Sequence, residues 1–291
     1  MDFKNGKELL TLCQEKNKKI SEVMLARECN LGEMAEEDVL ARLSGSLEIM
    51  KKAAHGPIEN PVKSLGGLIG GEGKKITEAA ADGAVPMLCG EPLTKAIAYA
   101  MAVLEVNGTM GLIVAAPTAG SAGVVPGVLL GTCEHYGFDD KKLLQGLLNA
   151  SAVGYILMRN ASVSGAEAGC QAEVGAASAM AASARVELFG GTPDQCLSAA
   201  SMAMSNLLGL VCDPIAGLVE APCQSRNAIG AANAFTCAQL ALSGIMHHVP
   251  FDEMGDAMYH VGCSLPMELR ETALGGNAGT PTGCSLCGGC K

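Results

Sequence analysis

Cysteines are the side chains in this sequence with the greatest capacity for chemistry. The 291 residues include 13 of them, an odd number that a complete set of intramolecular disulfides cannot use. Thiolates bind metal ions and iron-sulfur clusters and act as nucleophiles in catalysis. The first residues carry charged side chains instead of the apolar run of a signal peptide, so we expect a cytoplasmic protein, in which disulfides are rare. The roles that remain for the thiols are metal binding, catalysis and burial as small apolar residues.

Three cysteines stand in polar or proline-containing surroundings. Cys170 lies in a polar, glycine-broken passage, and Cys212 and Cys223 enclose a segment that contains Pro214 and Pro222. Proline restricts the backbone at its own position and at the preceding residue, which makes the neighbouring thiols rigid. Rigid thiols with polar neighbours suit an iron-sulfur cluster, but the spacing of Cys212 and Cys223 matches no compact ferredoxin pattern. On spacing alone, buried inert thiols are the commoner interpretation.

Two polar turns contain candidates for binding a substrate. Backbone N–H groups of a Gly-rich turn bind carboxylates, although glycines at such a place also serve close helix crossings. Short polar side chains near a helix end bind substrate or cluster sulfurs, or simply cap the helix. Both interpretations stay open for each turn. The candidates are Thr118, Gly120, Ser121 and Gly123 in the first turn and Asn160, Ser162 and Ser164 in the second.

Taken together, these motifs resemble the iron-sulfur-dependent L-serine dehydratases. The resemblance is carried by residues 116–123, residues 162–173, the passage from Cys212 to Cys223 and residues 270–276, and it spans nearly the whole chain. The chain is most similar to the separate α subunit of the two-subunit bacterial type. The resemblance implies a lyase that converts L-serine to pyruvate and ammonia with a [4Fe-4S] cluster and without pyridoxal phosphate.

The resemblance also implies how the cluster is held. The three family ligands fall on Cys170, Cys212 and Cys223, which leaves one iron free to act as a Lewis acid on the serine hydroxyl while a base removes the α-proton. None of the five histidines is singled out as that base. A Ser-His-Thr passage that a second domain supplies in single-chain relatives is absent here. We therefore expect a separate β subunit, from which the base can come.

Residues 281–291 form a cysteine-rich tail. Cys284, Cys287 and Cys290 have Cys-x2-Cys-x2-Cys spacing, which resembles half of a bacterial ferredoxin run without its fourth cysteine and proline. The tail has three open roles: it occupies the free iron, it binds or delivers a metal, or it takes no part in catalysis. Single-chain relatives carry a terminal cysteine, which favours the first role with Cys290 as the contact.

Two other functions stay open. A cysteine desulfidase-type lyase resembles this chain and also releases aminoacrylate. A non-catalytic iron-sulfur electron-transfer or carrier protein would use the C-terminal thiols, would cycle reversibly between redox states and would not turn over serine. Assays with serine, threonine and cysteine separate these functions.

The elements that must position these residues are predicted to be helices. Apolar residues recur at helical spacing through a charged N-terminal arm, residues 1–55, and strand signals are few, so we expect an all-α single domain over residues 1–291. The charge-free run 106–133 contains Pro117, Pro126 and several glycines, which indicates a buried segment broken by a turn instead of a membrane span. Charge-free residues 196–212 and 227–250 are expected to be buried helices.

Overall composition excludes two classes of partner. Hydrophobic residues make up 49% of the chain and charged residues 17%, enough apolar surface for a large core. The formal net charge of -10 argues against binding to nucleic acid or to an anionic membrane, since both require clustered Lys and Arg.

Overall fold

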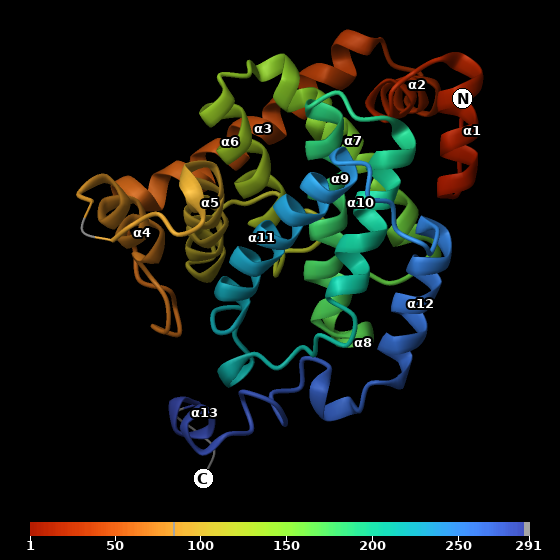
Figure 1. Cartoon of the computed structure of the whole chain (residues 1–291). Helices are drawn as coiled ribbons and strands as arrows, with labels where there is room; N and C mark the ends of the chain where they lie inside the picture. The colour runs from red at the N-terminus through yellow and green to blue at the C-terminus, as the bar shows by residue number, and fades with distance from the viewer. Residues whose placement is uncertain (84, 288–291) are drawn as a thin grey trace.

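The protein is a bundle of helices (Figure 1). The structure, a computed structural model, describes residues 1–83 and 85–287. Within these ranges there are 13 α-helices and no strand, and the one isolated β-bridge joins Cys212 and Arg270. The predicted all-α single domain is confirmed. The α-helices are α1 (Gly6–Lys16), α2 (Ile20–Gly32), α3 (Glu36–Glu59), α4 (Glu72–Ala81), α5 (Gly90–Gly108), α6 (Val124–Tyr136), α7 (Asp140–Asn160), α8 (Gly165–Ala168), α9 (Ala176–Leu188), α10 (Pro193–Asn206), α11 (Cys223–Leu242), α12 (Phe251–Ser264) and α13 (Pro281–Leu286).

Helix α9 is the centre of the bundle because small residues let its neighbours approach from every side. All 13 of its residues are buried, and it packs against α6, α7, α10 and α11. Glycines have the same effect where α5 crosses α6: a Cβ at Gly131 would lie 2.8 Å from the backbone nitrogen of Ala96. The abundance of Ala and Gly in the sequence therefore sets how closely the helices pack.

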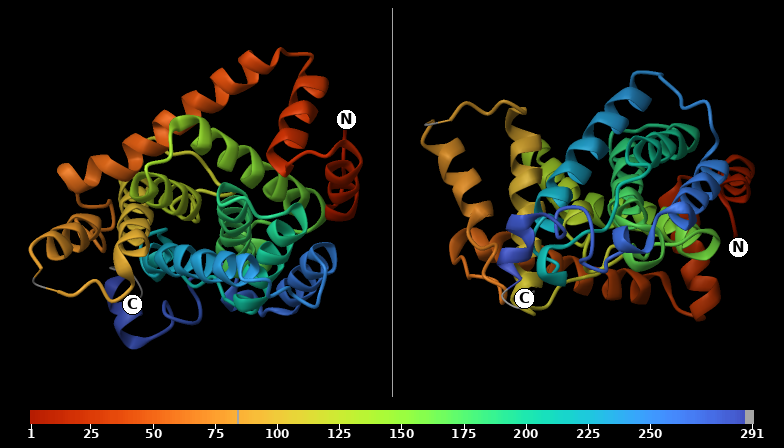
Figure 2. Two further views of the ribbon diagram at one scale, coloured as in Figure 1. Left: turned by 45° about the horizontal axis from the view of Figure 1, so that its top comes forward. Right: turned by 90° about the horizontal axis from the view of Figure 1, so that it is seen from below.

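The N-terminal arm packs on the bundle instead of standing apart from it. Phe3 and Leu9 are fully buried, and α3 crosses the outer face of α5 and α6 (Figure 2). The helix continues to Glu59, four residues past the expected end of the arm, and includes the buried Pro57. At the start of α1, the N–H groups of Gly6 and Lys7 donate to Asp252 on α12, at 2.6 and 3.0 Å.

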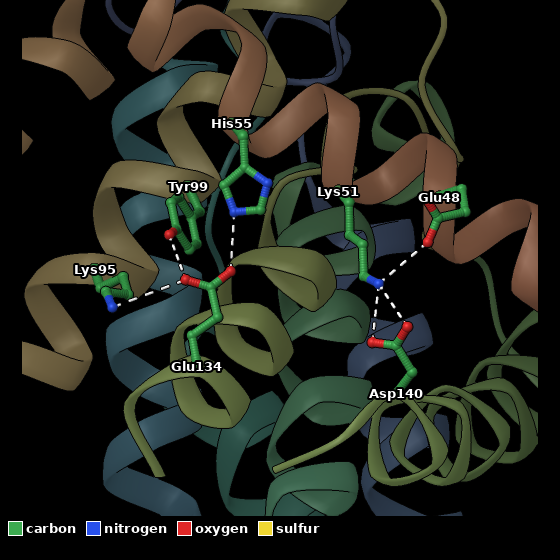
Figure 3. Close-up of polar contacts among 7 residues, drawn as sticks. All are labelled: Glu48, Lys51, His55, Lys95, Tyr99, Glu134 and Asp140. Atoms are coloured by element: carbon green, nitrogen blue, oxygen red, sulfur yellow. Dashed lines mark hydrogen bonds and ion pairs between the residues drawn. The ribbon is translucent and has the colours of Figure 1, made fainter. Parts of the chain in front are cut away.

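A partly exposed carboxylate joins the arm to the bundle (Figure 3). Glu134 on α6 accepts hydrogen bonds from Tyr99 Oη on α5, at 2.6 Å, and is paired with His55 Nε2 on α3, at 2.9 Å. Lys95 Nζ lies 3.8 Å from the same carboxylate. Burial opposes ionisation, but the hydrogen bonds from His55 and Tyr99 prevail and keep the pKa of Glu134 below its usual value. The contacts of Glu134 therefore join α3, α5 and α6.

Two predicted buried helices end earlier than expected. Helix α10 stops at Asn206 instead of reaching residue 212, and α11 stops at Leu242 instead of residue 250. Gly209 and Gly244 follow these ends with φ of 79° and 84°, a left-handed conformation that terminates a helix. The charge-free run 106–133 is broken as expected, by residues 109–123 between α5 and α6. No helix in the described ranges is long and apolar enough to cross a bilayer.

Candidate functional site

Cys170, Cys212 and Cys223 come together at one end of the bundle. Cys170 directly precedes a single π-helical turn, η1 (Gln171–Gly175), Cys212 lies in the irregular segment after α10, and Cys223 is the first residue of α11. This is the lower end in Figure 1, where the segment after α12 runs beneath the bundle. The thiols are 2%, 2% and 5% exposed, so all three are withdrawn from solvent.

Cys170 lies close to both of the other thiols. Its proximity, followed by burial, raises the pKa of Cys212 far above its usual value. Burial, followed by the charge of Cys170, raises the pKa of Cys223 to about 12. A thiolate at each of these positions therefore needs a cationic partner, and a bound metal centre would provide one.

Glu173 brings a carboxylate to the same place. It lies on the π-helical turn, where its Oε1 accepts a hydrogen bond from Thr118 Oγ1 at 2.8 Å and its Oε2 lies 4.0 Å from Cys212 Sγ. Burial raises the pKa of Glu173 to about 7, against the opposing hydrogen bond from Thr118. Extra residues of π-helical turns recur at functional sites because they redirect side chains.

Glycine lets these groups lie close to the backbone of neighbouring segments. A Cβ at Gly165 would lie 2.6 Å from Glu173 Oε2 and 3.0 Å from Cys212 Sγ, and a Cβ at Gly120 would lie 3.0 Å from Glu173 Oε1. Among the described residues, no three His, Cys, Asp or Glu side chains are close enough to hold one metal ion together. A cluster of four irons is ligated at its corners, so it needs wider spacing than one ion. The donor set of three sequestered thiols fits such a cluster.

The first predicted substrate turn adjoins this group. Thr118 and Ser121 contact each other through their hydroxyls at 3.0 Å, and Thr118 also reaches Glu173. The N–H of Gly123 already donates to Asn227 Oδ1. In the part of the chain that the structure describes, the N–H groups of Gly120 and Ser121 donate to no protein acceptor. Two of the predicted anion donors therefore remain free.

The second predicted substrate turn is divided. Ser162 donates to the carboxylate of Glu167 and accepts from the N–H of Ser164, so both serines organise the start of α8. Asn160, the last residue of α7, uses its side-chain amide on the carbonyl of Lys4, at 2.7 Å. The structure thus places the serines on the element that leads to Cys170, and ties Asn160 to the N-terminal segment.

The C-terminal segment is anchored to the site. Cys212 N donates to Leu269 O at 2.8 Å, and Glu271 N donates to Cys212 O at 2.7 Å. Farther along, α13 packs against the 3-10 turn η2 (Ile215–Gly217), between Cys212 and Cys223. Cys284 and Cys287 are therefore on the same end of the bundle as the three clustered thiols, whereas Cys290 lies outside the described residues.

Two charged residues at the site were not assigned a role from the sequence. Arg226, one helical turn after Cys223, pairs with Asp213 at 2.7 Å. Glu173 lies three residues after Cys170. The signals that could have found them are the position of Arg226 in an otherwise charge-poor helix and the presence of Glu173 in the Cys170 motif.

Comparisons with known proteins find relatives that match almost the whole chain. The family model described as "Serine dehydratase alpha chain" matches residues 15–278. A probable L-serine dehydratase alpha chain of Bacillus subtilis (strain 168) is 46% identical over 98% of this chain and 94% of its own length. An L-serine dehydratase alpha chain of Peptoniphilus asaccharolyticus is 44% identical over 96% and 94%, respectively. An L-serine dehydratase of Streptomyces coelicolor is 39% identical over 95% of this chain but only 60% of its own length.

Proposed function

Because this chain belongs to the serine dehydratase alpha-chain family, we propose that it is the α subunit of an enzyme that converts L-serine to pyruvate and ammonia. The observation that carries the proposal is the convergence of Cys170, Cys212 and Cys223 from three segments. We assign these thiols as ligands of a [4Fe-4S] cluster, with no role for pyridoxal phosphate.

The cluster, when bound by three cysteines, supplies a Lewis-acidic iron that makes the serine hydroxyl a better leaving group. The chain itself supplies the positioning groups. The free N–H groups of Gly120 and Ser121 are suited to hold the substrate carboxylate, as glycine-rich turns do for other anions. Glu173 holds the Thr118 hydroxyl beside that turn, and thereby fixes the turn relative to Cys212.

A partner chain is part of the proposal. The relatives from B. subtilis and P. asaccharolyticus are named alpha chains, and the single-chain relative from S. coelicolor is longer than this chain. We assign the missing portion to a β subunit that also contributes the base for the α-proton. Helix α13, which contains Cys284, packs against η2 between Cys212 and Cys223, and we keep Cys290 as the candidate contact to the free iron.

Anaerobic reconstitution with iron and sulfide, followed by assays with L-serine, L-threonine and L-cysteine, tests the function. The protein, assayed with its β chain, is expected to take up a [4Fe-4S] cluster and to prefer serine. Replacement of Cys170, Cys212 or Cys223 by serine should remove the cluster spectrum and lower activity by about a hundredfold or more. Loss of a residue that only supports a metal ligand lowers activity by about 10- to 100-fold, and loss of the ligand itself should cost at least as much.

Cys133→Ala is the matched control, because Cys133 is equally buried but lies within α6. This variant should keep both the cluster and activity. The combined variant Cys284→Ser, Cys287→Ser and Cys290→Ser should also retain the cluster. Loss of the cluster in the tail variant would overturn the ligand assignment, and a preference for cysteine with sulfide release would replace serine dehydration by desulfidation.

A further inference from the structure

Arg226 lies beside the thiol cluster, where it contacts both residues that flank Cys212. Its guanidinium pairs through Nη2 with Asp213 Oδ1 at 2.7 Å and donates through Nη1 to the carbonyl of Val211 at 2.8 Å. Arg226 belongs to α11, the helix that begins at Cys223. It thus connects the segment that holds Cys212 to the helix that holds a second proposed ligand.

Asp213 is itself held firmly. Its Oδ2 accepts hydrogen bonds from the backbone and side-chain nitrogens of Asn277, at 2.6 and 2.9 Å. A Cβ on the neighbouring Gly276 would lie 2.1 Å from this oxygen, so only glycine fits there. Among the described residues, the ion pair with Arg226 is the only polar contact of Oδ1. The carboxylate is therefore immobilised with one oxygen directed at the guanidinium.

The ion pair between Asp213 and Arg226 is largely buried, and stability alone does not explain why it is there. The Asp213 side chain is 2% exposed and that of Arg226 is 13% exposed. A buried ion pair by itself adds little stability, because the loss of hydration offsets the attraction between the charges. Burial lowers the pKa of Arg226, but the charges of Cys170 and Asp213 outweigh it and raise that pKa above its usual value. Three thiolates and the nearby Glu173 gather negative charge that a fixed cation would offset.

We propose that Asp213 holds Arg226 beside Cys212, and that Arg226 is a positioning residue that fixes the segment of this ligand and offsets the negative charge of the cluster site. The inference rests on the proposed function, because it requires a cluster on Cys212. Charge near a cluster is an established control of its potential. Arg226 supplies that charge and, through Val211 and Asp213, holds the ligand segment in place.

The first experiment compares Arg226→Gln and Arg226→Lys by redox titration of the reconstituted holoenzyme, followed by optical and EPR spectroscopy. Removal of a positive charge disfavours the added electron, so Arg226→Gln should have a lower midpoint potential than the unmodified protein. Arg226→Lys retains the charge and should shift less. Arg185→Gln is the control, because Arg185 is a buried arginine near the end of α9 that packs against Phe235. Its cluster potential should not change.

Asp213→Asn tests the other half of the pair. This variant retains the size of the side chain but loses the charge that holds Arg226. Iron should pass to an added chelator about tenfold faster or more, the effect expected when a supporting residue of a metal ligand is lost. Asp252→Asn, which alters a carboxylate on α12 that accepts from the N–H groups at the start of α1, is the matched control and should release iron at the original rate.

Unshifted potentials in both Arg226 variants, with normal iron content, would overturn the inference. If Arg226→Gln folds but binds no cluster, the Arg226→Lys variant provides the test. Retention of the cluster by Arg226→Lys supports a role for the positive charge, and loss of the cluster shows that the charge is not what the site requires. Unmodified protein that binds no [4Fe-4S] cluster would defeat the proposed function as well. The two failures are therefore distinguishable.

Discussion

At the scale of single residues, the close approach of Cys212 and Glu173 to α8 depends on the absence of a side chain at Gly165. Gly165 begins α8, and it has no positive φ that would require glycine for conformational reasons. Its role is spatial, because any Cβ there would press on Glu173 and on the Cys212 thiol. Replacing Gly165 by alanine therefore tests the effect of one added methyl group without straining the backbone.

We predict that Gly165→Ala impairs cluster assembly while the helices stay folded. Contacts of 2.6 and 3.0 Å are too short for a carbon atom, so either Glu173 or Cys212 must move. Iron retained after reconstitution, and serine turnover with it, should fall by about tenfold, as when a residue that supports a metal ligand is displaced. Circular dichroism should show unchanged helix content.

Gly56→Ala provides the control for Gly165→Ala. Gly56 lies within α3, and a Cβ there would meet nothing within 4 Å. Alanine favours a helix over glycine by about 0.5–1 kcal/mol, so this variant should be slightly more stable and fully active. Equal iron content in both variants would contradict the spatial role of Gly165.

The residues at the site were only partly predictable from the sequence. The cysteines and the turn at 118–121 were found because their motif resembles a known family. Glu173 and Arg226 were not assigned roles, since their contacts cross long stretches of sequence: Thr118 and Glu173 are 55 residues apart. Which distant charged residue meets a thiol depends on how α9 and α11 pack, and local sequence patterns do not report this packing.

At the scale of elements, the connection of α3 to α5 and α6 depends on one carboxylate. The pKa of Glu134 is depressed in the folded protein. A group of this kind stabilises the fold above its unfolded pKa, about 4.3 for Glu, and that stabilisation is lost as the pH falls through the folded value. Acid should therefore weaken this junction between helices.

Glu134→Gln is expected to lower the free energy of unfolding by about 1 kcal/mol at pH 5.5, a value reduced because the site is partly exposed. The difference from the unmodified protein should shrink as the pH falls below the unfolded value of about 4.3, because Glu134 itself then becomes protonated. Urea titrations at several pH values measure this difference. As a control, Glu48→Gln alters an exposed carboxylate on α3 that pairs with Lys51, and it should have almost no effect on the free energy of unfolding. A pH-independent difference would rule out the ionised carboxylate as the source.

Element types followed from the sequence, but element ends did not. Helical spacing and the lack of strand signals correctly predicted an all-α fold. The ends of α10 and α11 were misjudged because charge-free sequence predicts burial, and burial does not distinguish a helix from the loop that follows it. The helices end near Gly209 and Gly244, which adopt left-handed backbone conformations. Any glycine can adopt such a conformation, so the sequence does not show which glycine will end a helix.

At the scale of the whole molecule, the proposal that the base comes from a β subunit predicts that activity requires a second chain. We expect the isolated chain with a rebuilt cluster to show little serine turnover, and the β chain to restore it. Sedimentation of the mixture should show a complex of both chains, and turnover should rise with added β chain until the complex saturates. If the isolated chain turned over serine at the rate of the mixture, the requirement for β would be refuted.

The bond between Asp252 and the start of α1 also has a consequence for biosynthesis. Gly6 leaves the ribosome 246 residues before the carboxylate that caps it. At about 5–20 residues per second, this delay is roughly 10 to 50 s. Ser21 similarly waits for Glu187, whose carboxylate accepts its N–H. During translation the N-terminal helices therefore remain without their final contacts, with Phe3 and Leu9 exposed, and this interval is when the nascent chain most needs protection by chaperones.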